Sequence, residues 1–381
     1  MRSVRDIEVF ENIPILVRAA LNVPLEKGAV ANAYRLQRAL PTLRFLSSRG
    51  ARVIVISHIG EAGTETLAPV AERLASLLPG VSFCPESTGA RAREAVRLLA
   101  PGKILVLENL RRHREETTNV TAFSRELAAL GDIFIEDSFD TCHRRHASIV
   151  GLPKLLPSYA GLLLEEEVAE LSKALAPASP SLAIIGGAKF RTKEPVLASL
   201  LKSYDQVVVA GALANDFLKA AGHEVGKSLI SGTDSSHIAS LLSNPKIILP
   251  IDLLVVGATA GTPNLRDARV AHVSDVHPDE IILDVGPATD ALVRARVAGA
   301  KNILWNGPLG NYENGFSTAT DSLAHAIALS GAHSVVGGGD TIASIEKLGL
   351  FSKFSFVSTG GGAMLDFLAY GTLPGIDALG R

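Results

Sequence analysis

The sequence predicts an α/β protein with two Rossmann-like parallel-sheet domains joined by a helical hinge. Its 381 residues exceed the roughly 250 to 300 at which a single hydrophobic core stops growing, so two domains are expected. Short β-rich apolar runs alternate with segments of helical periodicity along the whole chain, which is typical of βαβ units. The composition, 47% hydrophobic and 20% charged, is that of a globular protein.

The predicted elements follow one another in a regular order. Strand-like runs at residues 13–17, 53–56, 104–107 and 133–135 form a first group, and runs at 182–185, 207–209, 303–305, 334–336 and 354–357 form a second. Helical periodicity occupies intervals such as 34–46 and 67–78. Residues 165–176 also have helical spacing and are stopped by Pro177 and Pro180, so we expect a connecting helix there. Two sheets of four or five strands fit this pattern.

Charge and cysteine content narrow the classes of function. The net charge of −2 argues against a nucleic-acid binder. Cys84 and Cys142 are the only cysteines, and no basic segment followed by an apolar one opens the chain, so we expect no disulfide framework and a cytoplasmic location. The most apolar stretch, residues 246–261, is interrupted by Pro250 and Asp252, and we expect no membrane segment.

Basic side chains follow the strands of the first half. Because ligands bind outside the carboxyl ends of parallel strands, these residues are expected to share one edge of the sheet, which we call the basic edge: Arg18, Arg35, His58, Arg111, His143, Arg144 and His146. Guanidinium groups clamp phosphate and carboxylate through paired hydrogen bonds, so the basic edge suits a small anionic substrate. The alternative is a solvated basic face.

Glycines follow the strands of the second half, and we call them the glycine-rich edge: Gly186, Gly187, Gly211, Gly307, Gly337–Gly339 and Gly360–Gly362. Backbone N–H groups in such turns approach phosphate oxygens closely, and a helix that begins there adds partial positive charge. The alternative is a set of turns chosen for tightness alone.

Three charged residues lie beside these glycines. Lys189 and Lys193 follow Gly187 and are candidates to bring ammonium groups to a polyphosphate, the alternative being two solvated lysines at a helix start. Asp340 follows Gly339 and offers a hard oxygen ligand for Mg²⁺ that arrives with a nucleotide, and it also suits the N-cap of a helix.

Three other nucleotide or metal sites are excluded by spacing. Residues 222–228 imitate a phosphate-binding P-loop but are one residue short between the glycines. Cys142, His143, His146 and His113 lack the spacing of common zinc sites, and arginines crowd the region. No GxGxxG occurs, which disfavours a dinucleotide site.

The ordered motifs resemble those of phosphoglycerate kinases from nearly the first residue to the last. In the first half RAALNVP at 18–24 is similar to the family's RVDFNVP, SHIG at 57–60 to SHLG, ENLR at 108–111 to ENLR, and HRRHAS at 143–148 to HRAHAS. In the second half GGAK at 186–189, WNGP at 305–308, GGGDT at 337–341 and STGGGA at 358–363 match the family's motifs.

The resemblance implies a monomeric, hinge-bending enzyme of glycolysis. It would transfer a phosphoryl group reversibly between 1,3-bisphosphoglycerate with ADP and 3-phosphoglycerate with ATP and Mg²⁺. Its domains would be a 3-phosphoglycerate-binding domain at 1–160, with a tail at 364–381 packing back on it, a connecting helix at 161–178 and a nucleotide-binding domain at 179–363. A carboxylate nucleophile needs no general base, so the lack of a catalytic dyad is no objection.

Site residues are carried over from the family by motif. The catalytic set implied is Arg35, Lys189, Gly361 and Gly362, and the substrate-binding set is Arg18, Asn22, Arg35, His58, Arg111 and Arg144. The nucleotide-binding set implied is Gly187, Ala188, Lys189, Lys193, Gly211, Asn306, Pro308, Gly310, Glu313, Gly338, Gly339, Asp340 and Thr341, with Asp340 as the metal ligand. No nucleic-acid or membrane partner is expected.

Departures from the family pattern concentrate on the substrate side. Ala20 stands where the family has Asp, Glu61 where it has Arg, Glu136 where it has Asn and Asp140 where it has Gly. Candidates to compensate for the lost cation are Arg112, Arg114 and Arg145. These changes motivate two alternatives to a phosphoglycerate kinase, namely a paralogous carboxylate kinase with a different substrate and a nucleotide-binding regulator without transfer activity.

Overall fold

A computed structural model describes residues 1–188, 190–232, 235–258 and 263–380. The chain divides into two compact units, which we call the first unit (Met1–Ala169 with Thr372–Arg381) and the second unit (Glu170–Gly371). The boundary falls within helix α6 (Leu162–Leu175), in the segment where a connecting helix was expected. Residues 364–371, which were expected to belong to the returning tail, lie in the second unit.

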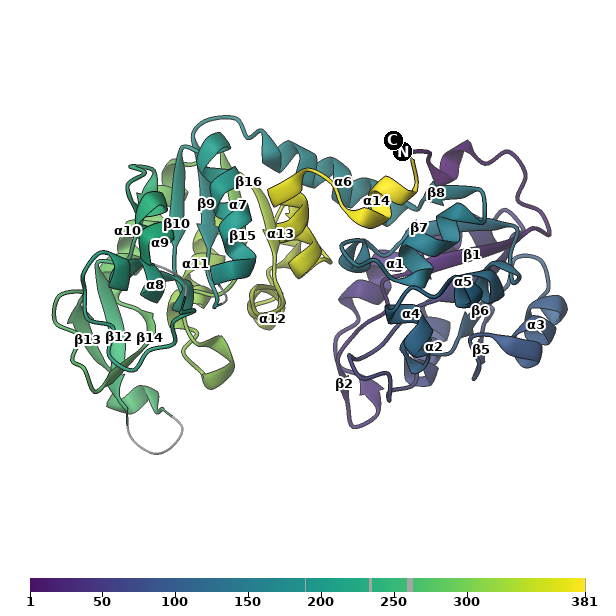
Figure 1. Cartoon of the computed structure of the whole chain (residues 1–381), viewed down its shortest axis with the longest axis horizontal. Helices are drawn as coiled ribbons and strands as arrows, with labels where there is room; N and C mark the ends of the chain where they lie inside the picture. Colours follow the sequence, from purple (N-terminus) through teal and green to yellow (C-terminus); the bar gives the residue numbers. More distant parts are fainter. Residues whose placement is uncertain (189, 233–234, 259–262, 381) are drawn as a thin grey trace. The chain divides into compact units, whose positions relative to one another are not determined.

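The first unit contains a six-stranded parallel sheet (Figure 1). Its strands, in spatial order, are β5 (Val81–Cys84), β6 (Ile104–Leu107), β4 (Arg52–Ile56), β1 (Pro14–Ala19), β7 (Ile133–Asp137) and β8 (Ser158–Ala160). The helices of this unit are α1 (Tyr34–Ser47), α2 (Ala68–Leu77), α3 (Gly89–Leu98), α4 (Arg114–Thr117), α5 (Thr121–Ala128) and α14 (Pro374–Ala378). A two-stranded hairpin, β2 (Leu25–Glu26) with β3 (Ala29–Val30), precedes α1.

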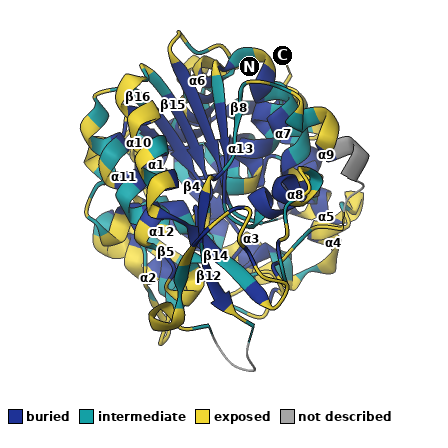
Figure 2. Ribbon diagram, turned by 90° about the vertical axis from the view of Figure 1, so that its left-hand side faces the viewer, coloured by how far each residue is buried: buried dark blue, intermediate teal, exposed yellow. Residues whose placement is uncertain are grey.

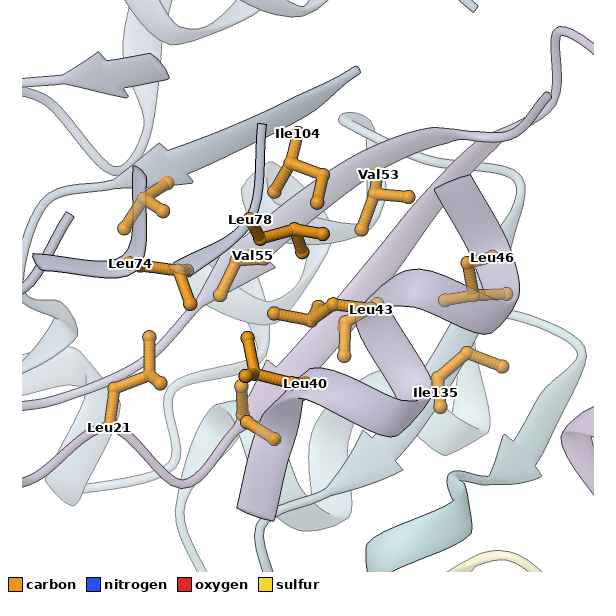
Figure 3. Close-up of a cluster of buried hydrophobic side chains, with 14 of the residues drawn as sticks. Leu21, Leu40, Leu43, Leu46, Val53, Val55, Leu74, Leu78, Ile104 and Ile135 are labelled. Atoms are coloured by element: carbon orange, nitrogen blue, oxygen red, sulfur yellow. The ribbon is translucent and has the colours of Figure 1, made fainter. Parts of the chain in front are cut away.

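Both faces of this sheet are covered, because alternate residues of each strand point to opposite sides. In β1, Val17 joins a cluster with Leu40 and Leu43 of α1 and Leu74 of α2. Figure 3 shows the side chains of Leu40, Leu43 and Leu74 in this cluster. The next residue toward the N-terminus, Leu16, joins a second cluster that includes residues of α3 and α5. Strands with uninterrupted apolar runs on both faces therefore form the centre of the unit, as those runs predicted.

The second unit repeats this plan with another six-stranded parallel sheet. Its strands, in spatial order, are β11 (Ile247–Ile248), β10 (Gln206–Val209), β9 (Ser181–Ile185), β15 (Asn302–Asn306), β16 (His333–Gly337) and β17 (Phe356–Val357). Its helices are α7 (Phe190–Ser203), α8 (Ala212–Ala220), α9 (Ser235–Leu242), α10 (Pro287–Gly299), α11 (Thr318–Ser330), α12 (Gly339–Lys347) and α13 (Gly361–Tyr370). Helix α13 packs on α7, and α10 packs on α11.

The second unit also contains an antiparallel sheet that the sequence analysis missed. It consists of β12 (Asp252–Gly257) between β13 (Arg269–His272) and β14 (Glu280–Val285). The predicted α/β class with two parallel sheets is confirmed, but the expectation of four or five strands per sheet is wrong, since each has six. The unpredicted members include the edge strands β5, β8 and β11.

The pattern of buried and exposed residues follows the layers of sheet and helix. Figure 2 shows the strands of the sheets mostly buried and the outward faces of the helices exposed. Trp305, the only tryptophan, is completely buried in β15. Across the described ranges, no helix has the combination of length and apolar character that a membrane crossing requires.

Candidate functional site

Arg18 lies at the carboxyl end of β1 and is almost completely buried, with 1% of its surface exposed. Its guanidinium donates to the hydroxyl oxygens of Ser148 at 3.1 Å and Ser57 at 3.3 Å. Ser57 follows β4, so the ends of β1 and β4 are tied together. Because a buried cation is costly unless its donors are satisfied, these contacts make Arg18 an organising residue below the surface of the basic edge.

His58 accepts a further hydrogen bond from Arg18. Nη2 of Arg18 lies 2.9 Å from Nδ1 of His58, and since arginine only donates, Nδ1 is the acceptor. Burial, reinforced by the positive charges of Arg18, Arg111 and Arg35, lowers the pKa of His58 well below its ordinary value. The neutral ring therefore carries its proton on Nε2, where it is a donor to an oxygen anion.

A chain of hydrogen bonds joins the other predicted substrate residues. Nη1 of Arg35 donates to the carbonyl of Asn22 at 2.5 Å, and Oδ1 of Asn22 accepts from the backbone N–H of Gly60 at 3.0 Å. The carbonyl of Gly60 in turn accepts from Nη1 of Arg111 at 2.7 Å. Arg35, Asn22 and Arg111 are therefore held together by the loop that follows β4.

Arg144 lies on the loop after β7 and is exposed, unlike the others. It lies near His146, and burial together with Arg111, Arg18 and Arg144 lowers the pKa of His146 to about 4. The structure thus brings Arg18, Asn22, Arg35, His58 and Arg111 together directly and places Arg144 at their margin.

The acidic departures lie among these cations. Oε2 of Glu61 is 2.8 Å from Nη1 of Arg111, and Oδ2 of Asp140 is 3.7 Å from Nη1 of Arg35. Glu136 is completely buried, and burial raises the pKa of its carboxyl well above the ordinary value. Ala20 is also completely buried.

The three arginines considered as compensators have different positions. Nη1 of Arg112 lies 3.5 Å from Oε2 of Glu108, a buried carboxylate whose other bonds hold the start of α2. Arg114 and Arg145 are exposed.

The second unit has a pocket of about 660 Å³ at the carboxyl ends of its strands. The sheet reverses its winding between β9 and β15, and ligands bind at such switch points in open α/β sheets. The predicted residues that line the pocket are Gly187, Ala188, Lys193, Gly211, Asn306, Pro308, Gly310, Glu313, Gly338, Gly339 and Asp340. Lys189 lies outside the described residues.

The backbone conformation and close packing at the pocket floor favour glycine at position 187. Gly187 has a φ of +81°, and a Cβ there would lie 2.6 Å from Nζ of Lys193. Lys193 donates to the carbonyl of Gly186 and is only 8% exposed, and burial lowers its pKa to about 8. The ammonium group of Lys193 therefore lies beside the backbone of Gly186 and Gly187, which a ligand can approach closely.

Thr341 and Gly361, two further predicted residues, lie next to the pocket. Thr341 is buried and accepts a hydrogen bond from the N–H of Gly307 at 3.0 Å, so it holds the loop after β15 instead of lining the pocket. Gly361 begins α13, and a Cβ on it would lie 3.4 Å from Cα of Gly338. The N-terminus of α13, with Gly361 and Gly362, therefore adjoins the pocket wall.

The carboxylates of the pocket fit a hard cation. Asp340 lines the pocket at the start of α12, and partial burial together with the nearby charge of Glu313 raises its pKa. Mg²⁺ is commonly held by one or two carboxylates together with substrate phosphates. Asp340 is therefore chemically suited to hold Mg²⁺ that enters with a nucleotide.

Several residues of the site were not found from the sequence. One wall of the pocket is apolar and comes largely from the antiparallel sheet, with Leu253, Ile281, Ile282 and Leu283. The apolar run at 246–261 was a signal for Leu253 alone. In the first unit, Glu116 accepts from the hydroxyl of Ser148 at 2.6 Å and from its N–H at 3.0 Å, and no pattern in the sequence marked that carboxylate.

Comparison with known proteins gives one family. The family model described as phosphoglycerate kinase matches residues 4–370. The phosphoglycerate kinase of Azorhizobium caulinodans is 44% identical, with 96% of each chain covered, and that of Roseiflexus castenholzii is 41% identical, with 99% of this chain and 98% of the relative covered. Among solved structures, phosphoglycerate kinase from Pyrococcus horikoshii has a TM-score of 0.88 at 30% identity, covering 100% of this chain and 98% of that one. The structure from Coxiella burnetii has a TM-score of 0.83 at 37% identity, covering 99% and 98%.

The support of Arg18 through Ser148 leads to a stability prediction. Glu116→Ala removes the acceptor of both Ser148 bonds inside the core, and we expect the free energy of unfolding of the first unit to fall by about 1 to 3 kcal/mol. Glu115→Ala, at the exposed neighbouring position, should change it by less than about 0.5 kcal/mol. Urea unfolding followed by far-UV circular dichroism measures both, while Trp305 fluorescence follows the second unit. Equal losses in the two variants would contradict the assigned role of Glu116.

Proposed function

The chain belongs to the phosphoglycerate kinase family, and from that premise we propose how its residues carry out the reaction. It is a phosphotransferase with a carboxyl group as acceptor, and it moves a phosphoryl group between 1,3-bisphosphoglycerate with ADP and 3-phosphoglycerate with ATP. The observation that best supports the assignment of roles is the hydrogen-bonded chain of Arg35, Asn22 and Arg111.

The first unit is proposed to bind 3-phosphoglycerate at the basic edge. Arg111, Arg144 and the Nε2–H of His58 would donate to its anionic groups, and Asn22 would hold the loop that positions them. Arg18 would act from below, since its donors are already engaged by serine hydroxyls and His58. Arg35, whose side chain is 29% exposed, would stabilise the charge of the phosphoryl group in transfer.

The second unit is proposed to bind the nucleotide in its glycine-lined pocket. The apolar wall from β12 and β14 suits a nucleobase, and the amides after β9 and β15 suit phosphates. Lys193 and Lys189 would supply positive charge to the phosphates, and the N–H groups of Gly361 and Gly362 at the start of α13 would face the group in transfer.

The chemistry then needs no general base. The acceptor carboxylate is already ionised at neutral pH, so one of its oxygens attacks the terminal phosphorus in line while the bond to the leaving ADP oxygen breaks. Mg²⁺, held by Asp340, would neutralise charge on the nucleotide phosphates. The protein contributes position and charge through Arg35 and the amides of α13.

We also propose that the protein is a cytoplasmic monomer that acts on small molecules only. Both cysteines, Cys84 and Cys142, are buried and unpaired, which fits a reducing compartment. Size-exclusion chromatography with light scattering tests the oligomeric state.

The function itself is tested by a coupled assay. Purified protein receives 3-phosphoglycerate, Mg²⁺ and ATP, and a dehydrogenase that consumes the acyl phosphate reports turnover by oxidation of NADH. Turnover is expected. Absence of turnover in folded protein that still binds ADP would overturn the assignment of substrate, and formation of ADP with another carboxylate would then identify a paralogous kinase.

Arg35 gives a prediction about the transition state. Arg35→Ala should lower kcat by about 100-fold or more, because it removes a cation from the group in transfer, and should leave the Kd for ADP within a few-fold. Arg44→Ala, on the exposed side of the same helix, is the control and should retain activity. Steady-state kinetics and calorimetry measure the two quantities. A comparable loss of ADP affinity in Arg35→Ala would contradict the proposed role of Arg35 in the transition state.

Lys193 gives a pH prediction. Its pKa of about 8 means that the side chain is mostly neutral at pH 9, so nucleotide phosphates must draw a proton onto it when they bind. The Kd for ADP should therefore rise as pH increases through 8, by up to about tenfold between pH 7 and pH 9. Lys193→Gln should bind more weakly at pH 7 and lose this dependence, whereas the exposed Lys202→Gln should keep it. An unchanged pH dependence in Lys193→Gln would refute the assignment.

A further inference from the structure

Arg111 and Glu61 form an ion pair whose two members differ greatly in exposure. Oε2 of Glu61 lies 2.8 Å from Nη1 of Arg111, and the side chain of Glu61 is 83% exposed while that of Arg111 is 7% exposed. A carboxylate that remains in contact with water therefore covers a guanidinium that is largely buried. Because the carboxylate of Glu61 remains hydrated, it gains little from the pair, and an external anion can compete with it for Arg111.

The loop that carries Glu61 does not need this ion pair for its shape. Asn109 holds the loop from below, with Oδ1 accepting from the N–H of Ile59 at 3.2 Å and Nδ2 donating to its carbonyl at 2.8 Å. Asn22 holds Gly60, and Gly63 is packed so closely that a Cβ on it would lie 2.1 Å from the carbonyl of Arg111. The loop backbone is thus held by contacts that do not involve the carboxylate of Glu61.

Arg111 is also anchored without Glu61. Nη1 of Arg111 donates to the carbonyl of Gly60 at 2.7 Å, and the contact with Glu61 involves the same nitrogen. A guanidinium has five N–H donors, so other donors remain for an incoming oxygen anion. Removing the carboxylate would leave the guanidinium in position and unmask its charge.

We propose that Glu61 is an internal competitor for the anion site of Arg111, which the anionic substrate must displace, and that it is the residue that sets substrate affinity in this chain. The inference rests on the proposed placement of 3-phosphoglycerate at the basic edge. Glu61 acts before the chemical step, because once displaced it is no part of the transition state. Its effect therefore falls on KM for the acceptor and not on kcat.

The first test is kinetic. Glu61→Gln keeps the size of the side chain and removes its charge, and we expect KM for 3-phosphoglycerate to fall by about 3- to 10-fold, with kcat and KM for ATP unchanged. Glu86→Gln removes the same charge from another exposed position of the first unit and should leave KM within about 1.5-fold. An unchanged or increased KM in Glu61→Gln would overturn the proposal.

A second test does not depend on turnover and so separates this inference from the proposed function. Inorganic phosphate is titrated against each protein, and its apparent Kd is obtained from the rise in thermal midpoint. Glu61→Gln should bind phosphate about 3- to 10-fold more tightly than the unmodified chain. In the background of Arg111→Gln, the same substitution should have no effect. Tighter binding that persists without Arg111 would refute the pairing, even if the enzyme turned over as expected.

Discussion

The first unit depends on a guanidinium that is buried at the end of its central strand. Moving a cation out of water costs several kcal/mol unless its donors find partners, and Arg18 finds them on segments far apart in the sequence. Ser57 and His58 follow β4, and Ser148 lies in a short helical segment (Ala147–Gly151) beyond β7. Ser148 is held in turn by the buried carboxylate of Glu116. One charge therefore ties the ends of β1 and β4 to the segment of Ser148, and it holds His58 in the tautomer whose proton is on Nε2.

The second unit is also proposed to bind anionic groups, but mainly through backbone N–H groups instead of guanidinium groups. Its pocket is lined by backbone and by only a few charges, so the proposed binding of phosphate depends on N–H groups and on how closely a ligand can approach them. That approach requires glycine at Gly187, whose φ is +81°, and at Gly211, where a Cβ would lie 2.6 Å from the backbone nitrogen of Gly187. The fixed charge near the floor, Lys193, is partly suppressed by burial. Pocket shape and backbone dipoles are therefore proposed to bind anions in this unit, as guanidinium groups are in the first.

The central strands and the positions of the site residues could be predicted from the sequence because they follow from local patterns. Strands β1, β4, β6 and β7 each contain an apolar run of at least three residues, and the parallel arrangement then brings Arg18, His58 and Arg111 to one edge. The edge strands β5 and β8 were missed because they are short and only partly buried. The antiparallel sheet was missed because Pro250 interrupts the apolar run that contains β12. Pairings such as Glu61 with Arg111, or Arg112 with Glu108, depend on side chains that the fold brings together, and no spacing in the sequence encodes them.

The acidic departures show why a cationic site can tolerate added carboxylates without losing its fold. Each of the three is accommodated by a different means. Glu61 stays in water, so its pairing with Arg111 involves little desolvation. Asp140 is buried, but its carboxylate accepts from the hydroxyl of Ser138 at 2.7 Å and faces Arg35. Glu136 is completely enclosed, and its raised pKa favours the protonated form, which carries no charge into the core. Of the three, only Glu61 has a side chain that is mostly exposed to solvent. A substitution of this kind alters the affinity of a site while leaving its architecture intact, which explains how the basic edge keeps its hydrogen-bonded framework although its sequence has diverged.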